Sequence, residues 1–239
     1  MIDYSKIQQI PSDMYAYIGD EEFEYIVDKL QFVEENYTNS NLAFGLACET
    51  EPTIGLARHI LSQLIFLKYK ESDNCLEILA VAIALSREGA YYRRSAIDYF
   101  EKFFSLEIDD KDAELISNRY SDWYLHSILA DLYEKEYEFQ KAVNQLEKCI
   151  QASGGQNPAD YTRIGDILIK CDIQQAKEYY DELLNSECYN LHKYTFDYAY
   201  NELCKKINAG YIYKKRSSKN RNTLSDEQII NAKVAEYLI

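Results

Sequence analysis

Histidines, cysteines and neighbouring carboxylates are the side chains of this sequence that could bind a metal or catalyse a reaction. The three histidines, His59, His126 and His192, have no His, Cys or carboxylate at a metal-ligand spacing such as H-x-x-x-H. Adjacent acids such as Asp109 and Asp110 point to different sides of a helix. The sequence also contains no glycine-rich phosphate loop and no G-x-S-x-G elbow. We therefore expect no catalytic residue, no metal site and no cofactor, and a protein that is not an enzyme.

The cysteines and the apolar runs indicate the compartment. Six cysteines, at positions 48, 75, 149, 171, 188 and 204, include no C-x-x-C pair, as expected for free, buried thiols in a reducing environment. Residues 1–9 show no basic region followed by an apolar core, so we expect no secretory signal. The longest apolar run, 78–85, is far shorter than the roughly 20 residues that cross a bilayer. The expectation is a cytoplasmic protein without a membrane span.

Apolar residues recur every three or four positions, as in Ile26, Leu30 and Val33, and this spacing predicts an all-α fold. Ser72 or Asp73 is expected to cap one helix, and Ser225 with Gln228 forms a capping box for the last one. The expected helices are 20–37, 52–70, one that follows the turn 71–74 and ends at 87, 92–106, 120–135, 139–152, 158–170, 173–185, 191–208 and 225–238, with a short apolar segment at 42–48.

A repeated pattern lies in the middle of the chain. Ala142 and Ala176 stand 34 residues apart (176 minus 142), and each is followed by large apolar residues at the same two offsets. A second small residue, Ala130 or Gly165, precedes each of them and lets two helices approach closely. The apolar positions of the two copies are Leu129, Tyr133, Leu146 and Cys149, and Ile164, Leu168, Tyr180 and Leu183. We expect all four small residues to be buried at helix junctions.

This pattern resembles the tetratricopeptide repeat of bacterial type, over roughly residues 53–185, with two good units and two degenerate ones beginning near Ala57 and Val81. His126 and Tyr161 stand where that family has Trp, and no unit ends in the usual proline. The resemblance implies a right-handed α-α superhelix of stacked antiparallel helical hairpins. It divides the chain into an N-terminal helical cap (1–52), a repeat region (53–208), and a basic linker with a C-terminal helix (209–239).

Tetratricopeptide proteins bind an extended peptide or a helix in their concave groove, and the resemblance therefore implies a protein-protein interaction scaffold. The groove candidates are Tyr124, Ser127, Asp131, Glu134, Lys135, Thr162, Asp166 and Lys170. The family's carboxylate clamp of Lys and Asn is missing, because Ser127 and Asp131, and Thr162 and Asp166, occupy its positions. Aspartates there favour a basic peptide as partner. The alternative is that these acids only keep the scaffold soluble.

A basic stretch interrupts the acidic composition near the C-terminus. Seven basic residues and no acid lie between Lys205 and Arg221, whereas the whole chain has a net charge of −14. The stretch could be a solvated linker, or it could dock on the acidic body of the same molecule or of a second copy, giving an autoinhibited or self-assembling regulator and a possible homodimer. A nucleic-acid-associated protein that acts through this tail is a further alternative, but it is disfavoured because an acidic body repels the polymer. The tail candidates are Lys214, Lys215, Arg216, Lys219 and Arg221.

Overall fold

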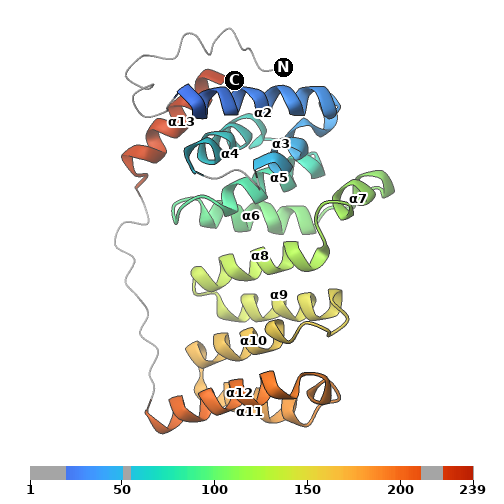
Figure 1. The fold of residues 1–239 in the computed structure, drawn as a ribbon, viewed down its shortest axis with the longest axis vertical. Helices are drawn as coiled ribbons and strands as arrows, with labels where there is room; N and C mark the ends of the chain where they lie inside the picture. Colours follow the sequence, from blue (N-terminus) through green and yellow to red (C-terminus); the bar gives the residue numbers. More distant parts are fainter. Residues whose placement is uncertain (1–19, 51–54, 211–222, 239) are drawn as a thin grey trace. The chain divides into compact units, whose positions relative to one another are not determined.

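The computed structural model describes residues 20–50, 55–210 and 223–238 (Figure 1). Every regular element in these ranges is a helix, and they contain no β-strand, which confirms the all-α expectation. The chain divides into two compact units, and the boundary falls between Arg119 and Tyr120. The first unit also includes the described C-terminal residues from Thr223 onward. The boundary between the units therefore lies inside the stretch 53–208 that the sequence pattern groups as one region.

The first unit is built around one helix that is apolar on all sides. Helix α5 (Cys75–Ser86) buries nearly all of its residues from Leu76 to Leu85, as expected for a helix enclosed by others. It packs against α3 (Leu42–Thr50), α4 (Gly55–Tyr69), α6 (Arg93–Phe104) and α7 (Asp110–Ser117), while α2 (Asp20–Asn36) packs on α3 and α4. A short 3-10 helix, η2 (Asn39–Asn41), leads into α3.

The N-terminal cap of α5 differs from the expected one. The side chain of Asn74, rather than that of Ser72 or Asp73, accepts hydrogen bonds from the backbone N–H groups of Leu76 and Glu77. The Ser72 hydroxyl instead accepts a hydrogen bond from the N–H of Asn74, 3.0 Å away, and holds the turn. Expecting Ser72 or Asp73 as the cap was therefore wrong by one or two residues.

The last helix, α13 (Asp226–Leu238), belongs to the first unit and packs on α4. Val234 and Ala235 are fully buried there. Its expected capping box is confirmed: the N–H of Gln228 donates to Ser225 Oγ over 3.2 Å, and the N–H of Ser225 donates to Gln228 Oε1 over 3.0 Å. The helices α4 and α13, almost 170 positions apart in sequence, thus pack together as a pair.

The second unit is a succession of helices in which each packs on the one before it. Its helices are α8 (Asp122–Lys135), α9 (Phe139–Ala152), α10 (Pro158–Cys171), α11 (Ile173–Leu184) and α12 (Tyr189–Asn208), and α10 also contacts α12 (Figure 1). The connections are short, so successive helices run antiparallel. Asp172 alone joins α10 to α11, and its side chain caps α11 by accepting a hydrogen bond from the N–H of Gln174.

The small residues of the repeat lie where neighbouring helices are closest. Ala130, Ala142 and Ala176 are fully buried, and Gly165 is buried as well, which confirms the expected packing. A Cβ atom on Gly165 would overlap the ring of Tyr180, which is itself only 1% exposed. Glycine at this position is therefore required by the approach of α11 to α10.

Candidate functional site

The expected groove residues lie on α8 and α10, the first helices of the two repeat units. Ser121 caps α8, and Asn157 with Pro158 starts α10, so both helices have fixed beginnings. Asp131 and Asp166 are exposed, as groove residues would be. Two of the other positions make local contacts: Tyr124 stacks on Tyr120 with ring centroids 5.8 Å apart, and the Thr162 hydroxyl donates to the carbonyl of Ala159.

An arginine that the sequence pattern does not single out neutralises the acids of α8. One guanidinium nitrogen of Arg163, Nη2, forms an ion pair with Asp131 and lies 3.5 Å from Glu134 Oε2. The other, Nη1, lies 3.4 Å from the hydroxyl of Ser127. Lys170 forms a second ion pair with Glu134. Arg163 is partly buried among these groups, and this burial lowers the pKa of its guanidinium.

The third groove acid also has a cation nearby. Lys206 Nζ on α12 lies 4.0 Å from Asp166 Oδ1. The groove acids Asp131, Glu134 and Asp166 therefore each lie near a base, namely Arg163 and Lys170 on α10 and Lys206 on α12. Surface ion pairs of this kind contribute little to stability, but they remove the excess negative charge that would attract a basic ligand.

An apolar groove lies elsewhere in the same unit, where α9, α10 and α11 meet. Its volume is about 250 Å³, and its floor consists of Ile164 and Leu183, both buried. The other lining residues are Glu147, Ile150, Tyr161, Tyr179, Glu182, Ser186 and Cys188. Tyr179 is held in place because its hydroxyl donates to the carbonyl of Tyr161 over 3.0 Å, and burial raises the pKa of this phenol.

The charged residues that line this groove are both acidic. Glu147 on α9 and Glu182 on α11 are exposed and form no ion pair with any residue in the described ranges. They differ in this respect from the acids of α8 and α10. Sequence reasoning missed the groove because its residues come from three helices and from the connection after α11, and only some of its apolar members follow the repeat pattern.

The remaining candidates are the histidines, the cysteines and the basic tail. His126 is half-buried, with Nδ1 2.8 Å from Gln145 Oε1, and burial lowers its pKa, as expected for a packed histidine. All six cysteines lie in the described ranges and are free, although only Cys48 and Cys149 are buried and Cys171 is exposed. The tail candidates Lys214, Lys215, Arg216, Lys219 and Arg221 lie outside the described residues.

The described ranges contain no group of three or more His, Cys, Asp or Glu side chains placed to hold a metal ion. None of their helices combines the length and the apolar character needed to span a bilayer.

Taken together, the described residues define an all-helical protein whose second unit is a series of antiparallel helix pairs. Comparison of the chain with protein-family models, with curated proteins and with solved structures found no match.

Proposed function

We propose that this protein is a non-enzymatic interaction scaffold whose stacked helical hairpins, arranged as a tetratricopeptide-like superhelix, bind a basic segment of another protein in the cytoplasm. The observation that carries the proposal is the apolar groove of α9, α10 and α11 with two acids, Glu147 and Glu182, that form no ion pair within the described part of the chain. An apolar groove flanked by uncompensated charge of one sign favours a segment with an apolar side chain and charges of the opposite sign. Six cysteines without a disulfide support a reducing compartment.

The partner's chemistry follows from the dimensions and charges of the groove. A cavity of about 250 Å³ accommodates one large aliphatic or aromatic side chain. Lys or Arg residues on either side of that anchor would reach Glu147 and Glu182. The acidic face first expected on α8 and α10 is a weaker second contact, because a ligand there must compete with Arg163 and Lys170 for Asp131 and Glu134.

The test compares two charge-removing double variants of the full chain. Glu147→Gln with Glu182→Gln removes the two groove acids, whereas Asp122→Asn with Glu178→Gln removes two exposed acids elsewhere in the same unit. The probe is a fluorescent 12-residue peptide of Lys and Leu with a Leu at every third or fourth position, followed by anisotropy. The groove variant should bind severalfold to about tenfold more weakly, since each exposed ion pair contributes about 0.2–1 kcal/mol. The control should bind like the parent.

A peptide of lysine alone provides the second arm. If it binds as tightly as the Lys-Leu peptide, the apolar groove contributes nothing and the proposal fails. Equal binding by the two double variants would refute the assignment to Glu147 and Glu182.

Self-association is a second candidate function, favoured by the outer face of α12. Leu191, Tyr194 and Tyr198 are 74%, 91% and 70% exposed, and Tyr194 and Tyr198, four residues apart beyond the kink at His192, lie on one side of the helix. The last helix of a repeat stack needs a polar outer face to stay monomeric, and large exposed apolar side chains favour a second copy. Tyr194→Lys with Tyr198→Lys should then halve the mass measured by light scattering. An unchanged mass would exclude this face as a dimer contact.

Docking of the basic stretch on the acidic body needs a test of its own. Deleting residues 211–239 would remove α13, which packs on α4, and would therefore disturb the first unit. Replacing Lys214, Lys215, Arg216, Lys219 and Arg221 with Gln changes only the charge. Tighter binding of the Lys-Leu peptide by this variant would indicate autoinhibition, and unchanged binding would leave the stretch as a linker.

A further inference from the structure

The exposed side chains at the start of α12 leave open which surface of a second copy covers them. Leu191 and Tyr194 are 74% and 91% exposed, more than any other large apolar side chains of the described ranges. Lys193 lies between them in sequence, is exposed, and forms no ion pair with any described residue. The start of α12 therefore presents apolar side chains together with an uncompensated positive charge.

The acids that follow Lys193 in α12 are directed to other groups. Asp197, one helical turn further on, is half-buried, and its Oδ1 accepts a hydrogen bond from the Tyr189 hydroxyl over 2.8 Å. Glu202 forms an ion pair with Lys205. Lys193 therefore remains available to an acid of another molecule.

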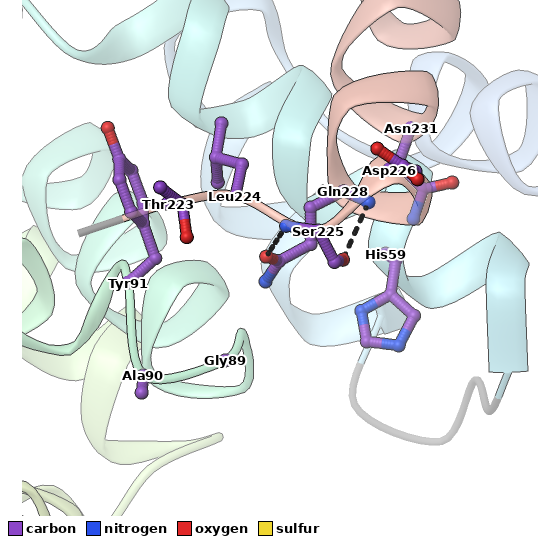
Figure 2. Close-up of a pocket in the computed structure, with 10 residues that line it drawn as sticks. All are labelled: His59, Gly89, Ala90, Tyr91, Thr223, Leu224, Ser225, Asp226, Gln228 and Asn231. Carbon is purple, nitrogen blue, oxygen red and sulfur yellow. Dashed lines mark hydrogen bonds between the residues drawn. The ribbon is translucent and has the colours of Figure 1, made fainter. Parts of the chain in front are cut away.

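The larger of two cavities that could receive such a side chain lies in the first unit, where α4, the turn after α5 and the start of α13 meet (Figure 2). Its volume is about 640 Å³. Several of its polar groups bond to the protein itself: His59 Nδ1 lies 3.2 Å from the carboxylate of Glu88, and dashed lines in Figure 2 mark the capping box of Ser225 and Gln228. A polar cavity of this width is a poor match for one apolar side chain.

The groove of α9, α10 and α11 is a better match in size and in charge. Its volume of about 250 Å³ suits one large side chain, and its floor of Ile164 and Leu183 is apolar. Glu147 and Glu182 are exposed and, like Lys193, form no ion pair with any described residue. Placing the start of α12 in the groove of another copy brings these opposite charges together.

The groove and the exposed start of α12 adjoin each other on one unit. Cys188, which lines the groove, precedes Leu191 by three residues. The ring of Phe196 on α12 lies 5.6 Å from the ring of the groove residue Tyr161, measured between centroids. A surface that carries both a projection and a matching depression is self-complementary, so two copies related by a two-fold axis can make the contact twice.

We propose that this protein forms a two-fold homodimer in which Tyr194 of each copy fills the groove of the other. Lys193 then lies within reach of Glu147 or Glu182, and Leu191 extends the apolar contact. The dimer rests on the groove proposed above for basic segments, and it names a second copy of the chain as an occupant of that groove. A basic segment of another protein competes with the dimer and releases monomers.

Light scattering and sedimentation of the full chain test the contact with two variants that change exposed residues only. Leu191→Ser with Tyr194→Ser removes the projection, and Glu147→Lys with Glu182→Lys reverses the charge of the groove. Each should raise the dissociation constant of the dimer by about tenfold or more, because aromatic anchors and close charge pairs dominate interfaces of this kind.

Each variant has a matched control that should leave the dimer intact. Tyr91→Ser removes an exposed ring of the first unit, labelled in Figure 2, and Asp122→Lys with Glu178→Lys reverses two exposed charges elsewhere in the second unit. A one-to-one mixture of the projection and groove variants is the decisive measurement. The groove of the first and the projection of the second are both intact, so the mixture should form dimers that neither variant forms alone.

Other arrangements give different results and would overturn the proposal. If the projection variant is monomeric but the groove variant still dimerises, α12 packs on α12 and the groove is not involved. If only replacement of the tail bases 214, 215, 216, 219 and 221 with Gln removes the dimer, the tail of the second copy is the occupant. A parent chain that is monomeric at about 0.1 mM excludes the dimer altogether.

The Lys-Leu peptide separates failure of the dimer from failure of the proposed function. The projection variant should bind this peptide more tightly than the parent, since no second copy competes for its groove. Peptide binding by a parent chain that is monomeric would overturn the dimer alone. A monomeric projection variant that does not bind the peptide, beside a parent that dimerises, would overturn the proposed function alone.

Discussion

The packing of α11 against α10 makes a sharp prediction for Gly165→Ala. The new Cβ would overlap three atoms of the Tyr180 side chain, Cε2, Cζ and the hydroxyl oxygen. Tyr180 is buried, and its hydroxyl donates to the carbonyl of Thr162 over 3.3 Å. Since carbon atoms prefer separations of about 3.5–4.0 Å, the ring must move by roughly 1 Å and weaken that hydrogen bond.

The magnitude follows from three opposing contributions. Replacing glycine with alanine inside a helix favours folding by about 1 kcal/mol. Overpacking a filled site costs about 1–3 kcal/mol, and the weakened hydrogen bond of Tyr180 costs about 1 kcal/mol more. Gly165→Ala should therefore lower the free energy of unfolding of the second unit by about 1–3 kcal/mol, although the same change is stabilising in most helices.

Urea unfolding followed by tryptophan fluorescence measures this effect directly. Trp123 is the single tryptophan of the chain, lies on α8, and donates its indole N–H to Asp160 Oδ2 over 2.7 Å, so its emission reports the second unit. Asn201→Ala, at an exposed position of α12, serves as a control for the helix-propensity gain and should be slightly stabilising.

A Tyr180→Leu background isolates the cause. Leucine lacks the three overlapping atoms, so adding Gly165→Ala to it should be stabilising by about 1 kcal/mol, with the sign opposite to that in the parent. If Gly165→Ala stabilises the parent chain, or if its sign is the same in both backgrounds, the inferred closeness of α10 and α11 is incorrect.

Three further predictions concern buried or half-buried groups. Asp160→Leu should destabilise the second unit by about 1–3 kcal/mol in the same fluorescence assay, because it leaves the Trp123 indole N–H without its acceptor, and Asp160→Asn should cost less. Burial raises the pKa of the Cys149 thiol to about 12, so iodoacetamide at pH 8 should label the exposed Cys171 before Cys149. Mass spectrometry measures the order of labelling, and early labelling of Cys149 would contradict its burial. Burial also lowers the pKa of His126, so the unfolded chain takes up the proton before the folded chain as the pH falls below about 6.5. The free energy of unfolding should therefore decline from pH 7.5 toward pH 5.5. In urea unfolding, His126→Gln should make the midpoint depend less on pH over this range.

The helices with strong apolar spacing could be predicted from sequence, and their ends depended on local chemistry. Helix α9 has the expected bounds, Phe139–Ala152, because its apolar residues recur regularly and Gly154 with Gly155 follows it. The capping box of α13 was predictable because it involves two residues, Ser225 and Gln228, that are only three positions apart. At α5 three consecutive capping residues compete, and only the geometry of the turn selects Asn74.

Helix α7 was not predicted because it has little apolar pattern to detect. Its eight residues, Asp110–Ser117, bury only Ile116, so neither spacing nor hydrophobicity marks it as a helix. Its one local signal is Asp109, whose side chain accepts a hydrogen bond from the N–H of Asp112. The docking of α13 on α4 had no local signal at all, because it joins segments from opposite ends of the chain.

The ion pairs of Arg163 could have been found by comparing charges one repeat apart. Arg163 follows Asp131 by 32 residues, close to the period of 34, so the two residues occupy facing positions on successive first helices. Charged residues about one repeat period apart should be compared before the net charge of a groove is inferred from sequence. The repeat period that predicts the positions of the small residues therefore also predicts that Arg163 faces Asp131.

The net charge of −14 therefore describes the binding surface poorly, because it counts paired and unpaired acids alike. Screening limits electrostatic attraction to about 8 Å at physiological salt, so a basic segment responds to the acids near it that lack a cation of their own. Asp131 has Arg163, whereas Glu147 and Glu182 have none in the described ranges. Asp131→Lys would place a second cation beside Arg163 and leave Arg163 with Glu134 alone, so its main effect should be on the packing of α8 with α10. Binding of a basic segment should depend far more on Glu147 and Glu182.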